Sequence, residues 1–413
     1  MKLLIFPFLL FTSFICSGQD TKGQFIKDKK TGCIVWYKTG FAEDSVSWRG
    51  GCINGFANGP GVFTGYTKGQ PTSKYEGQLT KGKPNGAGVF TFANNSLTLA
   101  GNFSQGEILN LREDCLPHVH KQIVFRSDSL DYYIGDNGEK QLYYQALVPV
   151  GKPKGALVLL PGTGETTEHV ISSTQQLCEL AYDHQLAVIV PSINQRLTMT
   201  KGVVHLLNAL LASAIKEYAI PKEKFVIGGF SMGGLFSLRY TELAVENPAN
   251  TTAVPLAVFS CDGPVDLATI YGNFKKKLAK FPGAPEPSYG IRELEQYCNG
   301  SPLQVPQPYI YYSCYSHSQV DGGNAKFLKD TPVRIYNDVD PNWWMVNRDV
   351  DMYDMNALDQ SAMILFLMDR GNKGAEFINA LGKGRRIEGN RHPHSWSIIE
   401  PRELISWMLK YMG

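Results

Sequence analysis

Over residues 121–413, short apolar runs alternate with stretches in which apolar residues recur at helical spacing. The runs predict strands at residues 122–125, 130–134, 142–148, 156–160, 187–190, 225–227, 256–260, 333–336 and 375–381. Helices are predicted between them, as in the apolar stripe from Val203 to Ile215, and a closing helix is predicted at Pro401–Tyr411. The alternation predicts an α/β fold, a doubly wound and mostly parallel sheet whose first three strands form an antiparallel edge. Ligand chemistry is then expected at the carboxyl ends of the strands.

Residues 48–106 follow a different, glycine-rich pattern. Two copies share an aromatic-x-Gly start and three further glycines at the same offsets: Trp48, Gly50, Gly55, Gly59 and Gly61, then Tyr75, Gly77, Gly82, Gly86 and Gly88. A truncated third copy begins at Leu99 and keeps Gly101 and Gly106. Glycines at such places allow positive φ or close backbone approach, so the pattern predicts short hairpins. A single hairpin is too small to be stable alone, and stacked units are expected to share a buried face.

This pattern resembles the MORN repeat (membrane occupation and recognition nexus). The resemblance covers residues 30–110, with the segment Gly32–Trp36 as the end of an earlier copy. It implies an all-β MORN-repeat module at residues 19–118, ahead of an α/β domain at residues 119–413. MORN arrays are associated with lipid or protein contact, so the resemblance implies a membrane or protein surface contact. The alternative is a structural module that extends or shields the next domain.

The segment Phe225–Leu235, FVIGGFSMGGL, places Ser231 where a buried strand becomes a helix. Gly229 and Gly233 complete the pattern G-x-S-x-G of a nucleophile elbow, in the strand-turn-helix context that the motif requires. The turn strains its central residue, and neighbours without side chains avoid a collision two positions on either side. Ser231 is therefore the predicted nucleophile.

Two backbone N–H groups are expected to bind the oxyanion that forms during attack on a carbonyl. The N–H of Met232 lies at the predicted helix start and points to where that charge develops. The second donor is expected from the loop after strand 156–160, where Thr163 is the predicted residue and Gly164 the next choice.

A serine hydroxyl needs a base to remove its proton. His394 is the predicted base, because it lies after the last strand and just ahead of the closing helix. His392, next to Pro393, is the main alternative, and His317 is a third.

The acid that orients the histidine is expected after strand 333–336. Asp340 is the predicted acid, on the argument that Asn337 opens a turn and the acid comes four residues into it. Asp338 is the rival within the same turn, and Asp262, after strand 256–260, is a third choice.

Residues 121–413 thereby resemble the α/β-hydrolase superfamily, especially its secreted esterase-like or peptidase-like bacterial members. The resemblance implies acyl transfer to water through an acyl-serine, without a cofactor, on a small-molecule ester or, second, a peptide. Residues 262–328 are expected to form a cap that selects the substrate, and Trp343 and Trp344 to line the same cleft. The alternative is a binding or scaffold protein with MORN repeats and an inert hydrolase domain.

The composition of the chain argues against nucleic-acid binding and against a metal site. The formal net charge of +2, with charges interspersed, lacks the basic patch of a nucleic-acid-binding protein. Neither Cys nor His has metal-ligand spacing, so no metal is expected. Of the seven cysteines after Cys16, an odd number, candidate disulfide pairs are Cys33–Cys52 and Cys298–Cys314.

The N-terminus has the layout of a secretory signal peptide, with Lys2, an apolar run and then small residues. We expect residues 1–18 to be removed and the protein to be secreted or periplasmic. An uncleaved membrane anchor and a lipoprotein acylated at Cys16 are the alternatives; bulky Ile15 argues against the second.

Overall fold

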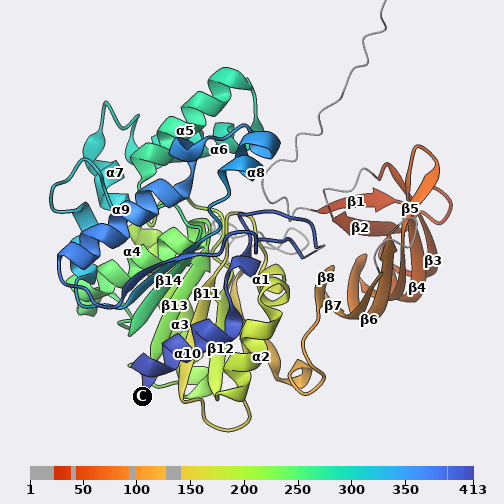
Figure 1. Cartoon of the computed structure of the whole chain (residues 1–413). Coiled ribbons are helices and arrows are strands. Elements are labelled where there is room, and N and C mark those ends of the chain that lie inside the picture. Colours follow the sequence, from red (N-terminus) through yellow and green to blue (C-terminus); the bar gives the residue numbers. More distant parts are fainter. Residues whose placement is uncertain (1–22, 39–42, 93–97, 127–140, 388) are drawn as a thin grey trace, which may run out of the picture.

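The computed structural model describes residues 23–38, 43–92, 98–126, 141–387 and 389–413. Within these residues the chain forms two sheets, one in an N-terminal β module and one in a larger α/β domain (Figure 1). This confirms the expected α/β class with an N-terminal β region. The predicted signal peptide and the predicted strand at 130–134 lie outside the described residues.

The sheet of the α/β domain has the order β16-β15-β14-β13-β11-β12-β10-β9. Its strands are β9 Val119–Arg126, β10 Gln141–Leu147, β11 Gly155–Leu160, β12 Leu186–Pro191, β13 Phe225–Phe230, β14 Ala257–Cys261, β15 Val333–Asn337 and β16 Ala375–Asn379. Neighbouring strands from β12 to β16 pair in parallel, whereas β10 pairs antiparallel with both β12 and β9. The carboxyl ends of the parallel strands therefore meet at one edge, where the predicted chemistry belongs.

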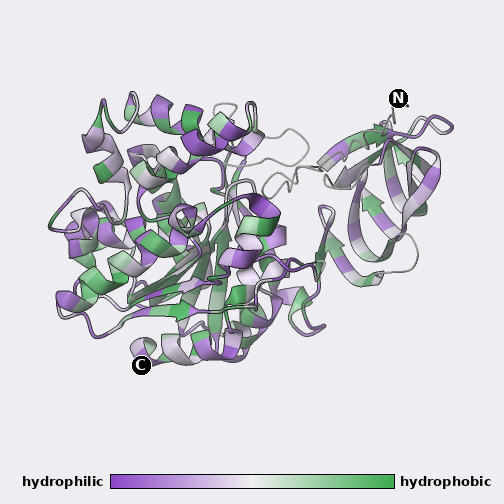
Figure 2. Cartoon of the chain, turned by 45° about the horizontal axis from the view of Figure 1, so that its top comes forward, coloured by the Kyte–Doolittle hydropathy of each residue, from purple (hydrophilic) through white to green (hydrophobic). Residues whose placement is uncertain are grey.

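Helices cover both faces of this sheet. They are α1 Thr167–Ser173, α2 Gln175–Asp183, α3 Lys201–Tyr218, α4 Met232–Glu246, α5 Leu267–Lys280, α6 Pro285–Cys298, α7 Pro306–Tyr312, α8 Pro341–Arg348, α9 Asn356–Asp369 and α10 Pro401–Met412. Side chains of a strand point alternately to the two faces. On β13, Phe225 and Ile227 join the core on the α3 and α4 side, and Val226 joins the core on the α2 and α10 side. The strands are accordingly apolar along their length (Figure 2). No helix in the described residues has the length and apolar character needed to cross a membrane.

The β module is a curved sheet around an aromatic core. Its strands are β1 Gly23–Lys27, β2 Ile34–Lys38, β3 Ser45–Ile53, β4 Phe56–Thr67, β5 Gln70–Thr80, β6 Lys83–Phe92, β7 Thr98–Ser104 and β8 Glu107–Leu109. Phe63 stacks on Tyr75 at 5.3 Å between ring centroids, and Phe103 meets Tyr75 edge-on at 5.1 Å. These rings come from the three repeat units, so the units share one buried aromatic core, as expected.

The cysteines confirm one of the two candidate pairs. Cys33 and Cys52 form a disulfide that ties β2 to β3. Cys298 and Cys314 are both buried free thiols, so the prediction of a second disulfide between them is wrong. Both side chains pack among apolar residues in the core of the α/β domain.

In each full copy, the glycine after the aromatic residue and the last repeated glycine lie against that aromatic residue. A Cβ atom on Gly61 would be 2.3 Å from Cη2 of Trp48, and one on Gly88 would be 2.3 Å from the hydroxyl oxygen of Tyr75. Trp48 and Tyr75 are almost completely buried. The aromatic-x-Gly start and the later glycine therefore form one packing unit, in which the ring fills the space that a side chain would take.

Gly61→Ala is expected to lower the free energy of unfolding of the module by roughly 1–3 kcal/mol, the usual cost of forcing a methyl group into a packed core. Backbone as well as side-chain atoms block the new Cβ, since the carbonyl oxygen of Arg49 is 2.5 Å from it. Thermal unfolding followed by tryptophan fluorescence measures the change. Gly272→Ala, on α5 with nothing within 4 Å of the new Cβ, is the control and should not destabilise the protein. Equal stability of the two variants would contradict this packing account.

Two contacts between the module and the α/β domain bear on the site. At the first, the hydroxyl of Ser172 on α1 donates a hydrogen bond to the carbonyl of Ile108 on β8, and Leu109 packs into the core of the α/β domain. At the second, Ile387 packs against the core of the module. Ile387 belongs to the connection between β16 and α10, so the module touches the segment that leads to His394.

Candidate active site

Ser231 lies on a sharp turn between β13 and α4. Its backbone has φ 54° and ψ −124°, a conformation that residues with a side chain rarely adopt. Its N–H donates to the carbonyl of Cys261 on β14 at 3.0 Å, and its carbonyl accepts from Gly234 at 2.9 Å. These bonds hold the strained turn, which is the geometry that the sequence motif predicts.

The two motif glycines are required by close contacts around this turn. A Cβ on Gly229 would be 2.2 Å from the carbonyl oxygen of Gly233, and a Cβ on Gly233 would be 2.1 Å from the carbonyl oxygen of Leu160. The first contact lies within the turn, and the second lies where α4 packs against the end of β11. The sequence argument placed these glycines against neighbouring strands, and only the second one lies there.

His394 lies beside this turn, at the wall of the same cavity that Ser231 lines. Its imidazole centroid is 4.4 Å from that of Phe230, the residue before the serine. Nδ1 of His394 is 2.5 Å from Oδ2 of Asp262. A carboxylate at Nδ1 holds the proton there and leaves Nε2 as the acceptor.

The acid partner of His394 is therefore Asp262, and the prediction of Asp340 is wrong. Asp340 caps α8, where Oδ1 accepts from the N–H of Trp343 at 3.0 Å, and its Oδ2 is 3.0 Å from Arg391. Asp262 directly follows β14, the strand next to β13, whereas Asp340 lies beyond the end of β15, one strand further away. The sequence analysis weighed Asp262 as a third choice.

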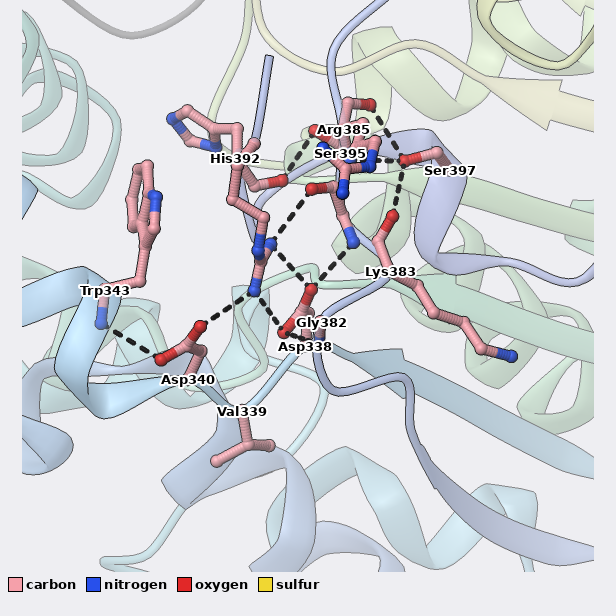
Figure 3. Close-up of polar contacts among 12 residues, drawn as sticks. Asp338, Val339, Asp340, Trp343, Gly382, Lys383, Arg385, His392, Ser395 and Ser397 are labelled. Carbon is pink, nitrogen blue, oxygen red and sulfur yellow. Dashed lines mark hydrogen bonds and ion pairs between the residues drawn. The ribbon is translucent and has the colours of Figure 1, made fainter. Parts of the chain in front are cut away.

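Asp338, the rival in the β15 turn, has a structural role. It is completely buried, and its carboxylate accepts from the N–H groups of Gly382 and Gly384 and from Arg391 (Figure 3). These residues belong to the connection that carries His394. Asp338 and Asp340 thus anchor the loop of the histidine without contacting its ring.

His392 also lines the cavity, but its surroundings disfavour a base. Burial first, and then the nearby guanidinium of Arg386, lower the pKa of His392 to about 2. Nε2 of His392 is 3.1 Å from Arg348, and its ring packs at 4.7 Å from that of Trp343. An imidazole whose protonated form is disfavoured this strongly is a weak general base, which favours His394.

His317, the third candidate, lies outside this cavity. Its Nε2 is 2.7 Å from Asp359 on α9, and its backbone N–H donates to Asp266. His317 thus has a carboxylate partner as His394 does, but among the described residues it does not line the cavity of Ser231.

The two expected oxyanion donors lie in the wall of this cavity, which Thr163, Met232 and Ser231 all line. Met232 is the first residue of α4, so its N–H has no acceptor within the helix. The N–H of Gly164 donates to the carbonyl of Asn194 at 2.8 Å, and that of Gly162 to Glu165 at 2.7 Å. In the described part of the chain the N–H of Thr163 has no such acceptor, which favours Thr163 over Gly164.

The cavity has a volume of about 1050 Å³. Helices α5 and α6, from the segment expected to form a cap, and helix α8 supply its outer walls; among their side chains are Phe274, Phe281, Tyr289, Trp344 and Arg348. Trp344 thus lines the cleft as expected, while Trp343 packs on His392. In the described residues, no group of three or more His, Cys, Asp or Glu is arranged to hold a metal ion.

Comparison with known protein families identifies part of the β module. The family model of the MORN repeat matches residues 53–70 and 75–97, which confirms the MORN repeats of the β module. No curated protein sequence matches the chain.

Solved structures similar to the chain include MPT51 of Mycobacterium tuberculosis, at 12% identity and a TM-score of 0.44 over 68% of this chain and 96% of that one. An esterase of the archaeon Pyrobaculum calidifontis has 12% identity and a TM-score of 0.44, over 71% and 82% of the two chains. A fungal esterase of Rhizomucor miehei has 13% identity and a TM-score of 0.43, over 71% and 83%. Likenesses at this level carry no information about substrate, so the chemistry has to be inferred from the site.

Proposed function

We propose that the protein is a serine hydrolase that cleaves ester bonds, ahead of amide bonds, through an acyl-serine intermediate. The observation that carries the proposal is the meeting of three groups at one cavity: a serine on a strained strand-to-helix turn, a histidine hydrogen-bonded to a buried carboxylate, and two N–H donors.

The proposed reaction has two halves. Ser231 Oγ attacks the carbonyl carbon while Nε2 of His394 accepts its proton, and Asp262 stabilises the imidazolium that forms. The N–H groups of Met232 and Thr163 donate to the oxyanion, and each such donor contributes about 3–4 kcal/mol in the transition state. His394 then protonates the leaving group, and a water molecule, deprotonated by the same nitrogen, releases the acid from Ser231.

Export is part of the proposal. It rests on the signal-like residues 1–18 and is supported by the disulfide between Cys33 and Cys52, because such bonds persist in oxidising compartments. We further propose that the MORN module provides a contact surface toward a membrane or a protein. A scaffold protein with an inert hydrolase domain is the competing hypothesis.

A covalent probe separates the two hypotheses. A fluorophosphonate is expected to label the folded wild-type protein at Ser231, because it reacts with a serine that an adjacent base activates. Ser231→Ala should abolish labelling, and Ser361→Ala, an exposed serine on α9 outside the cavity, should leave it unchanged. Folded wild-type protein that resists the probe would support the scaffold. A panel of acetyl, longer-chain and feruloyl esters with aminoacyl amides then identifies the preferred bond.

A further inference from the structure

Behind Asp262 lies a group of three amide side chains. Asn337 ends β15, and Asn356 and Gln360 lie one turn apart on α9 and so share a face of that helix. Asn337 and Gln360 are buried, with 2% and 0% of their surface exposed. None of the three contacts His394, and the proposed mechanism gives them no role.

Both asparagines donate to the carboxylate oxygen that the histidine does not use. Nδ2 of Asn337 is 2.7 Å from Oδ1 of Asp262, and Nδ2 of Asn356 is 3.2 Å from the same oxygen. Nδ2 of Asn356 is also 3.0 Å from the backbone carbonyl of Asp262. The other carboxylate oxygen, Oδ2, is hydrogen-bonded to His394, so the two oxygens of Asp262 have different partners.

Gln360 fixes the amide of Asn337 in turn. Its Oε1 accepts from Nδ2 of Asn337 at 2.9 Å, and its Nε2 donates to the carbonyl of Gly263 at 2.8 Å. The two hydrogens of the Asn337 amide are thus divided between Gln360 and Asp262, which leaves that side chain a single orientation. The hydrogen bonds therefore connect the carbonyl of Gly263 to Gln360, Gln360 to Asn337, and Asn337 to the carboxylate of Asp262.

These hydrogen-bond donors compensate for the burial of the Asp262 carboxylate. The residue has φ 49°, in the left-handed region, and it is buried with 4% of its surface exposed. A buried carboxylate that lacks hydrogen-bond donors is strongly destabilised. Neutral amide donors stabilise the charge without adding a second one, whereas an aspartate at position 337 would place a like charge at hydrogen-bond distance.

We propose that Asn337 and Asn356 are positioning residues of the reaction, which fix the carboxylate of Asp262 so that Oδ2 faces Nδ1 of His394. The inference rests on the proposed function. Residues of this kind, which act through the group that touches the reacting atoms, typically change activity by about 10–100-fold when they are replaced.

Asn337→Leu keeps the size of the side chain and removes the donor. We expect kcat to fall by roughly 10–100-fold with KM nearly unchanged, because both hydrogens of the Asn337 amide are used by Asp262 and Gln360 and neither is available to a substrate. Asn356→Leu should give a smaller loss of kcat. This variant should also be less prone to misfold, since Asn356 is only half-buried. The matched control is Asn372→Leu. Asn372 is a buried asparagine before β16 whose Nδ2 donates to the carbonyls of Leu328 and Thr331 before β15, so its replacement should lower stability but not kcat.

A double-mutant cycle distinguishes positioning from a merely structural role. In an Asp262→Ala background, Asn337→Leu should cause no further loss of kcat, because the group through which it acts is gone. A loss in that background equal to the loss in the wild type would overturn the inference, as would a wild-type kcat in both single variants. Failure of the proposed function itself is seen separately, as Ser231→Ala protein that retains full activity.

Discussion

His394→Ala is expected to lower kcat on an ester substrate by roughly a million-fold, the loss seen when a triad histidine is removed from a serine hydrolase. His394 lines the same cavity as Ser231, and its Nδ1 is hydrogen-bonded to a carboxylate, which leaves Nε2 as the acceptor. The variant should fold normally, because the ring lies at the cavity wall and supports little of the core. Steady-state kinetics with circular dichroism as a folding check measures both expectations.

His317→Ala is the matched control for this prediction. Like His394, His317 has a carboxylate partner within hydrogen-bond distance, Asp359 at 2.7 Å, but it lies outside the cavity. Its loss should leave kcat within a few-fold of the wild type. A million-fold loss in His392→Ala, with activity retained in His394→Ala, would show that the base is the other cavity histidine.

Much of the fold could be predicted because buried strands and glycine repeats have local signatures. The apolar runs around Val226, Val258 and Ile335 became the central strands β13, β14 and β15 with ends that moved by a few residues. The helix Pro401–Met412 begins at the predicted proline. The segment 262–328 gave no such signal, and its helices, of which α5 and α6 line the outer wall of the cavity, were expected only as an insertion.

The candidate site was predictable where a motif fixes the backbone and not where side chains converge from distant segments. Ser231 and Met232 follow from a five-residue pattern, and His394 from its place after the last strand. The choice among Asp262, Asp338 and Asp340 depends on strand order, since only Asp262 follows the strand next to β13. The order β15-β14-β13 is set by long-range pairing, which a single sequence does not display.

The amides behind Asp262 were missed for a related reason. Asn337 was interpreted only as the opening of a turn, and Asn356 and Gln360 are ordinary polar positions on a helix. A weak signal existed, since two amides four residues apart on a mostly apolar helix lie on one face of it. The role of that helix face can be recognised only in the folded protein, where α9 packs against β15.

Asp262→Asn is expected to lower kcat about ten-thousand-fold, because an amide in place of the carboxylate favours the wrong tautomer of the histidine. The amide N–H would donate to Nδ1 of His394, so the ring proton would move to Nε2, and Nε2 could no longer accept the proton of Ser231. KM should change little, since the carboxylate oxygens of Asp262 are used by His394 and by the two asparagines. The variant should fold, because the amide fills the same space.

Asp340→Asn is the comparison that decides between the two acids. It weakens an ion pair with Arg391 at 3.0 Å, between side chains that are 22% and 26% exposed, so it should cost about 1 kcal/mol of stability or less and change kcat by only a few-fold. A ten-thousand-fold loss in Asp340→Asn together with a near-wild-type Asp262→Asn would mean that His394 exchanges partners when substrate binds. The reverse result follows from the static geometry, because the carboxylate on the neighbouring strand is the one already within 2.5 Å of the ring.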